Sequence, residues 1–181
     1  MKNLLILLCF IYLINLFISL PSEEILIKLK NDIIENKLLI NPNKTHFLFD
    51  ESNYTRLDIN HKKMKILYEK QEDIYNNLKI SNFIFVVDYI DENQESIELA
   101  TKRLRQYLYY AFEVDIDNSI VALFSMKSRK VRISVGKKTN EKITDSDAQS
   151  MIDDLASFLR NEEYYEAWLK FVNDIKYYYN S

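Results

Sequence analysis

The stretch SIVALFSMKSRKVRISVG, residues 119–136, decides the fold. Its first part, residues 119–126, is a mostly apolar run that predicts a β-strand. Its second part, residues 130–135, alternates three apolar with three polar side chains, which predicts a strand with one face toward a core. The connection between the two parts is short, so the pair is predicted to form a β-hairpin that ends at Gly136, the only glycine of the chain.

Outward from this hairpin, the pattern predicts strands alternating with helices. FIFVVDYI, residues 83–90, is a continuous apolar and aromatic run that is typical of a strand covered on both faces. Residues 97–111 carry a single apolar stripe at helical spacing. A strand, a helix and a second strand in this order predict a parallel pair, to which the hairpin adds one antiparallel strand.

Helical spacing also marks four other segments, and a loop is expected between the first two of them. The expected helices cover residues 23–39, 57–78, 148–159 and 163–178, and the loop runs from Asn41 to about residue 56. Because the predicted strands are so apolar, helices must cover both faces of the sheet. The sequence therefore predicts an α/β fold, an α/β/α sandwich built on a small mixed sheet.

The first twenty residues, MKNLLILLCFIYLINLFISL, form a separate apolar segment. Lys2 precedes the apolar run and Pro21 ends it, which is the pattern of a secretory signal peptide. The alternative is an uncleaved membrane anchor through residues 4–20, because a run of roughly 20 apolar residues can span a bilayer. As a signal peptide or as an anchor, this segment is expected to direct the chain into the secretory pathway, and the two alternatives stay open.

Composition excludes several kinds of protein. Charged residues make up 28% of the chain, both signs are mixed, and the formal net charge is −3, so no nucleic-acid partner is expected. The only cysteine, Cys9, lies within the first twenty residues. A chain without that segment could form no disulfide and could use no cysteine nucleophile.

Two glycosylation sequons and two histidines lie outside the predicted strands. Asn43 and Asn53 each begin an Asn-x-Thr triplet, which predicts glycosylation in an exposed loop if the chain enters the lumen. His46 falls in the same loop and His61 beside lysines, so both histidines are expected to be solvated. The sequence holds no His-x-x-x-His, no Gly-x-Ser-x-Gly and no glycine-rich phosphate loop.

An acidic edge of the sheet is the candidate site. The strand that begins at residue 119 and the strand that ends at Gly136 should meet at one edge, with Asp115, Asp117 and Asp145 beside them. Carboxylates gathered at one edge could hold a hard divalent cation such as calcium through oxygen ligands. The alternative is that Thr144 and Asp147 form a capping box and that the acids only complement the dipole of the following helix.

Five pieces of the chain, taken in order, resemble the TPM domain family. They are FDESNYTRLD, DNSIVALFS, RKVRISVG, ITDSDA and FLRNEEYYEAW, and the resemblance covers residues from about 47 to 175. That family includes a thylakoid lumen protein, a photosystem repair factor and nematode levamisole-receptor modulators. It implies an α/β/α sandwich in which the acids of the cleft correspond to Asp50, Asp117 and Asp145, and it implies calcium as the possible ligand.

The chain departs from the family pattern in two places. YYAFEVDIDNS stands where the family has a glycine-rich turn, and Lys137 and Lys138 stand where a second glycine often follows the first. Close approach of a backbone to phosphate favours glycine, so these changes weaken a phosphatase interpretation. The stretch VGKKTNEKITD is most similar to the receptor-modulator branch, although that branch commonly carries cysteines.

The sequence thus predicts residues 1–20 as leader or anchor, residues 21–46 as a helix and loop, and residues 47–181 as a TPM-like domain. The expected function is that of a secreted or membrane-tethered extracellular module. It would modulate a membrane protein, and the resemblance suggests a ligand-gated acetylcholine receptor. The alternative is a calcium-binding domain with weak metal-dependent acid phosphatase activity.

Overall fold

The computed structural model describes residues 45–50, 54, 61–90 and 96–181. Four strands form one sheet in the order β1-β2-β3-β4, and their bounds are His46–Asp50, Ser81–Val87, Ser119–Ser125 and Lys130–Val135. β1, β2 and β3 are parallel to one another, and β4 is antiparallel to β3. The mixed sheet and the hairpin predicted from the sequence are both confirmed.

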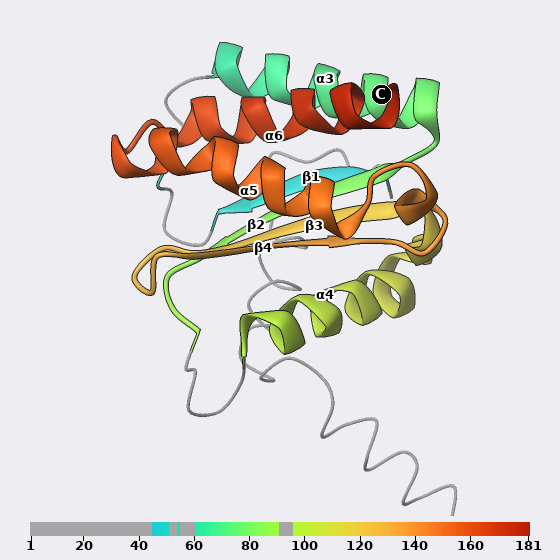
Figure 1. The fold of residues 1–181 in the computed structure, drawn as a ribbon, viewed down its shortest axis with the longest axis horizontal. Helices are drawn as coiled ribbons and strands as arrows, with labels where there is room; N and C mark the ends of the chain where they lie inside the picture. The colour runs from blue at the N-terminus through green and yellow to red at the C-terminus, as the bar shows by residue number, and fades with distance from the viewer. Residues whose placement is uncertain (1–44, 51–53, 55–60, 91–95) are drawn as a thin grey trace, which may run out of the picture. The chain divides into compact units, whose positions relative to one another are not determined.

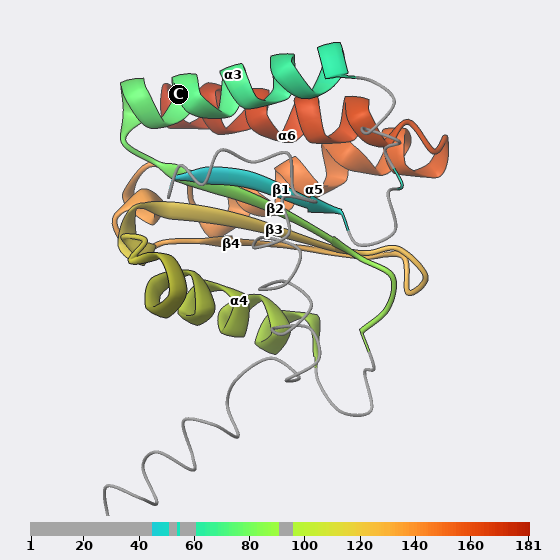
Figure 2. The same cartoon turned by 180° about the vertical axis from the view of Figure 1, so that it is seen from behind.

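Four helices cover the two faces of this sheet. Three of them lie on one face, α3 (His61–Leu78), α5 (Asp145–Arg160) and α6 (Tyr164–Tyr179), and α4 (Ile97–Phe112) lies on the other (Figure 1). Seen from behind, α3 and α6 run side by side above the sheet (Figure 2). Two short 3-10 helices, η1 (Ile116–Asn118) and η2 (Thr139–Glu141), precede β3 and follow β4. The α/β/α sandwich is therefore confirmed.

The main core lies between the sheet and the three helices on one face. Trp168 of α6 is fully buried, and its ring centroid lies 4.2 Å from that of Phe124 on β3. Alternate residues of the strands face this core, and the others face α4, where Phe47 of β1 contacts Phe112 at 6.1 Å between ring centroids. Both faces of β1, β2 and β3 are thus apolar, which explains why these strands show no alternating pattern.

Strand β1 corrects the sequence prediction, which placed residues 41–56 in a loop. Residues 46–50 pair in parallel with residues 82–86 of β2 and form an edge of the sheet. His46, predicted to be solvated, is instead 7% exposed. The remaining helix predicted near the N-terminus, residues 23–39, lies outside the described residues, and so does the leader.

Candidate functional site

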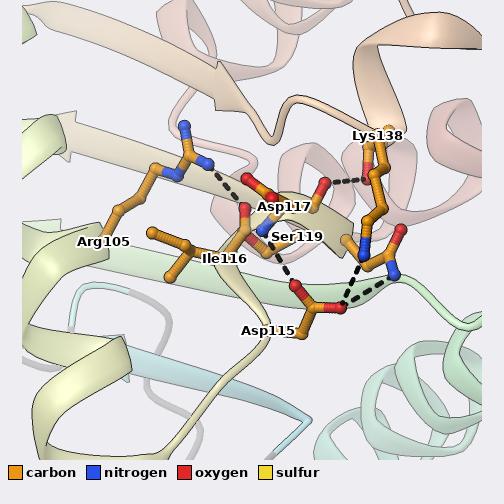
Figure 3. Close-up of polar contacts among 8 residues, drawn as sticks. Arg105, Asp115, Ile116, Asp117, Ser119 and Lys138 are labelled. Carbon is orange, nitrogen blue, oxygen red and sulfur yellow. Dashed lines mark hydrogen bonds and ion pairs between the residues drawn. The ribbon is translucent and has the colours of Figure 1, made fainter.

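The predicted acidic edge forms where β3 begins and β4 ends. Ile120 is paired with Val135, and the amide of Gly136 donates to the Ser119 carbonyl at 2.7 Å. The carbonyl of Asp117, on η1, accepts from the Lys138 amide at 3.0 Å. The turn after β4 is therefore bonded to the backbone of η1, as Figure 3 shows.

Gly136 is required here for space and not for backbone conformation. Its φ is not positive, but a Cβ atom at this position would clash with the carbonyl oxygens of Ile116 and Asp117. These are backbone atoms, which cannot rotate away as the end of a side chain could. Gly136 therefore has a packing role, because the absence of a side chain lets the end of β4 contact η1.

Arg105 of α4 forms hydrogen bonds with residues of β4 and η1 at the same edge, from the other face of the sheet. Its guanidinium donates to the Ile116 carbonyl at 2.5 Å (Figure 3). It also donates to the Val135 carbonyl at 3.1 Å and to the Ser134 hydroxyl at 3.2 Å. Burial lowers the pKa of Arg105, and the nearby charge of Asp117 opposes this effect. The arginine thereby joins α4, η1 and β4 through its two terminal nitrogens, while its buried Nε has no hydrogen-bond partner among the described residues.

Asp115 is also engaged by neighbouring groups. Its carboxylate accepts from the Asp117 amide at 3.1 Å and from the Asn118 side chain at 2.9 Å, and it lies 3.5 Å from Lys138 Nζ. Partial burial acts to raise the pKa of Asp115, but these hydrogen bonds and the lysine charge outweigh it, so the pKa is lowered. Its role is that of a cap for η1.

The start of α5 carries the capping box that the sequence predicts at Thr144 and Asp147. The Thr144 hydroxyl accepts from the Asp147 amide at 3.2 Å, and the Asp147 carboxylate accepts from the Thr144 amide at 2.8 Å. This is a complete capping box, as predicted. Asp145 is the exposed first residue of the same helix.

The third predicted carboxylate lies elsewhere. Asp50 is the last residue of β1, and its carboxylate accepts from the Tyr54 amide at 3.0 Å. β1 and β3 are parallel, Asp50 ends β1, and Asp117 comes just before β3. Asp50 therefore lies at the carboxyl ends of the parallel strands, which form the opposite edge of the sheet from Asp117 and Asp145. Within the described residues, no three His, Cys, Asp or Glu side chains are grouped to hold a metal ion. A metal-binding role for these carboxylates stays a prediction.

A pocket of about 810 Å³ lies near this opposite edge. It is bounded by the turn between β3 and β4, by the end of α5 and by the start of α6. Its apolar lining includes Phe124, Val131, Ile152, Leu159 and Tyr164. In open α/β sheets ligands bind beyond the carboxyl ends of the parallel strands, which is where this pocket lies.

The pocket is basic although the chain carries a net negative charge. Of the described residues that line it, four are basic (Lys127, Arg129, Lys130 and Arg160) and one, Glu162, is acidic. Lys127 is paired with Asp88 at 2.8 Å. The excess of cationic side chains favours an anionic ligand.

Aromatic rings form one wall of the pocket. The Tyr54 ring meets the Tyr164 ring edge-on at 5.8 Å, and Tyr164 stacks on Trp168 at 6.4 Å. Burial raises the pKa of Tyr54, with a further contribution from a hydrogen bond to Asp88. Burial also raises the pKa of Tyr164, whose hydroxyl can donate a hydrogen bond near neutral pH.

Backbone geometry around the pocket is unusual for these residue types. Arg129 and Glu162 have φ values of 52° and 59°, in the left-handed region, which costs a non-glycine residue roughly 1–2 kcal/mol. The N-cap residue of α6, Glu163, makes no side-chain capping hydrogen bond, in contrast to the closed capping box of α5. The helix terminus that can still attract an anion is thus at the pocket edge.

This pocket could not be predicted from the sequence, because its residues come from distant parts of the chain. Tyr54, Phe124, Arg129 and Tyr164 lie in four different pieces quoted for the resemblance, but those pieces do not indicate that these side chains meet in one pocket. Left-handed conformations at Arg129 and Glu162 could not be read from residue type, since neither is glycine or asparagine.

The remaining predicted features fall outside the described residues. These are the leader of residues 1–20 and the sequon asparagines, Asn43 and Asn53. Among the helices that the structure describes, none is both long and apolar enough to cross a membrane.

Comparison with known proteins supports the family resemblance. The sequence model of the TPM domain matches residues 61–178. Two solved structures have a similar fold at low identity: the N-terminal domain of protein cg2496 from Corynebacterium glutamicum and an N-terminal domain from P. gingivalis. The first has a TM-score of 0.53 and 12% identity over 71% of this chain and 76% of that one. The second has a TM-score of 0.60 and 15% identity over 76% of this chain and 83% of that one. No curated protein matches the chain.

Proposed function

Because the chain belongs to the TPM domain family, we propose that it is a binding module that recognises an acidic group of a partner protein. The pocket between the β3–β4 turn and the α5–α6 turn is the binding site. The observation that carries this proposal is the basic lining of the pocket, with four cationic residues and one acid among the described residues, in a chain of net charge −3.

The edge at Gly136 has a structural role in this proposal. Its arginine, its cap carboxylate and its helix terminus are all engaged by neighbouring groups of the protein. Hydrolysis of a phosphate ester by Asp50, Asp117 and Asp145 would need them at one place, whereas Asp50 lies at the opposite edge. We therefore rank binding above phosphatase activity.

The partner that we propose is a membrane protein, met on the extracellular or lumenal side. The apolar leader and the two sequons support this location. The family resemblance supplies a ligand-gated acetylcholine receptor as the specific candidate, and such an assignment rests on analogy within the family.

Affinity capture from the source membrane tests the proposal. The bait is the wild-type chain, and the comparison is Arg129→Asn with Arg160→Gln, which removes two pocket charges. Asparagine is chosen because it tolerates the left-handed conformation of position 129. The matched control is Lys137→Gln with Lys142→Gln, which removes two exposed charges beyond the other edge of the sheet.

We expect the wild type and the lysine control to retain the same membrane protein, and the arginine variant to lose it. Retention by all three proteins would show that the pocket is not the binding site. Capture of no membrane protein by the wild type would contradict the proposed partner.

A further inference from the structure

We infer that the pocket recognises a carboxylate group placed next to an apolar side chain, as a peptide segment of a partner protein presents it. The inference rests on the proposed function, because it names the ligand class of the same site. It draws on three features of the pocket: its two arginines, its apolar lining and the open start of α6.

The two arginines supply the site for the carboxylate. Arg129 lies in the turn before β4 and Arg160 is the last residue of α5, so they enter the same pocket from two different elements. A guanidinium offers parallel N–H donors that match the two oxygens of a carboxylate. The start of α6 lies beside them without a side-chain cap from Glu163, and its dipole adds a further attraction for negative charge.

The Tyr164 hydroxyl at the aromatic wall can complete the recognition of the anion. Tyr54 and Tyr164 both line the pocket and are protonated at neutral pH, but the Tyr54 hydroxyl is already hydrogen-bonded to Asp88. A protonated hydroxyl donates to a carboxylate, whereas a phenolate would repel it. Glu162, the one acidic residue among the described lining residues, repels an anion at this rim, but the basic lining residues outnumber it.

The apolar lining requires that the ligand is more than a simple anion. Phe124 is 1% exposed and packs behind the pocket on Trp168, and Ile152 and Leu159 of α5 form the side opposite β4. The volume, about 810 Å³, lies in the range of roughly 300–1,000 Å³ that is usual for ligand sites. A bare inorganic ion would leave this surface in contact with water, whereas an aromatic or branched side chain beside the carboxylate would cover it.

Three small probes separate the parts of this inference. N-acetylphenylalanine carries a carboxylate next to an aromatic side chain. Its amide has the same shape without the charge, and N-acetylglycine has the charge without the apolar group. Trp168 is the only tryptophan of the chain and stacks on Tyr164 of the pocket wall, so its emission reports on binding, and calorimetry on the same samples provides a second readout.

We expect N-acetylphenylalanine to bind the full chain with a dissociation constant on the order of 10⁻⁴–10⁻³ M, as befits a ligand of its size. The amide and N-acetylglycine should bind at least about tenfold more weakly, since each lacks one of the two contacts. Arg129→Asn with Arg160→Gln should lose the preference for the acid over the amide, and Lys137→Gln with Lys142→Gln should keep it.

Equal affinities for the acid and the amide would overturn the inference, as would the absence of both a fluorescence change and heat. Equal affinities for N-acetylphenylalanine and N-acetylglycine would show a simple anion site and would also overturn it. If the membrane capture fails but the probe series gives the expected affinities, the proposed partner is contradicted and the proposed ligand class still stands.

Discussion

Gly136 packs directly against the backbone of Asp117, so that a Cβ atom at position 136 would lie closer than 3.0 Å to the Asp117 carbonyl oxygen. The Gly136→Ala substitution should therefore destabilise the protein by about 1–3 kcal/mol or more, as is usual when extra volume enters a packed site. Urea unfolding of the two proteins measures the difference in the free energy of unfolding.

Ser146→Ala is a suitable control for that measurement, because residue 146 is exposed in the first turn of α5 and should change stability little. An alanine at position 136 that left the free energy of unfolding unchanged would contradict the packing role of the glycine.

Arg105 is predicted to be the main stabilising side chain at the same edge. Replacing it by methionine removes three hydrogen bonds and leaves the carbonyls of Ile116 and Val135 without this donor. We expect a loss of about 3 kcal/mol in the free energy of unfolding, because hydrogen bonds from charged donors are among the stronger ones. Lys102→Met, at an exposed position of the same helix, should change it by less than about 0.5 kcal/mol.

The capping box at α5 predicts distinct effects for substitutions of its two members, Thr144 and Asp147. Thr144→Ala removes the hydroxyl that accepts from the Asp147 amide and should cost about 1 kcal/mol. Asp147→Asn should cost less, because an amide oxygen can still accept from the Thr144 amide. Thermal unfolding of both variants checks this order, and a larger effect of Asp147→Asn would point to a role of its charge beyond capping.

His46 should make stability depend on pH. Burial lowers its pKa below the usual 6.5, and the charge of Glu72 only partly opposes this effect. The unfolded chain therefore binds a proton more readily than the folded one in the window below pH 6.5. The contribution to stability is fully present above pH 6.5 and is lost as the pH falls toward the lowered pKa of the folded state.

The free energy of unfolding, measured from pH 8 to pH 5, should thus decrease more steeply for the wild type than for His46→Gln. The difference between the two curves grows with the size of the lowering of the His46 pKa, by about 1.4 kcal/mol for each unit. The two curves should run parallel above pH 7.5. Parallel curves over the whole range would show that His46 is not buried as a neutral group.

The hairpin and the capping box could be predicted from the sequence because their signals are local. Residues 130–135 alternate in polarity, and Thr144 stands three residues before Asp147, so each pattern is contained within a few positions. Gly136 was correctly placed at the end of β4 by the same reasoning. The parallel pair β2 and β3 followed from the helix between them.

Strand β1 and the pocket could not be predicted in this way. HFLFD is short, is buried on both faces and follows a Pro- and Asn-containing turn signal, so neither length nor alternation marked it as a strand. The pocket brings together Tyr54, Arg129 and Arg160, which no motif connects. Missing β1 also left Asp50 without a position, and its place at the opposite edge became visible only from the parallel register.

Calcium binding by Asp50, Asp117 and Asp145 is open to a direct test by calorimetry. Calcium takes about 6–8 oxygen ligands, and extracellular calcium sites bind with dissociation constants of about 10⁻⁴–10⁻³ M. Asp50 cannot join the other two carboxylates, because β1 and β3 are parallel and these residues lie at opposite ends of them. We therefore expect the same heat of calcium binding for the wild type and for Asp117→Asn with Asp145→Asn. A heat that is present in the wild type and lost in this variant would instead establish a metal site at the Gly136 edge, with ligands additional to the two carboxylates.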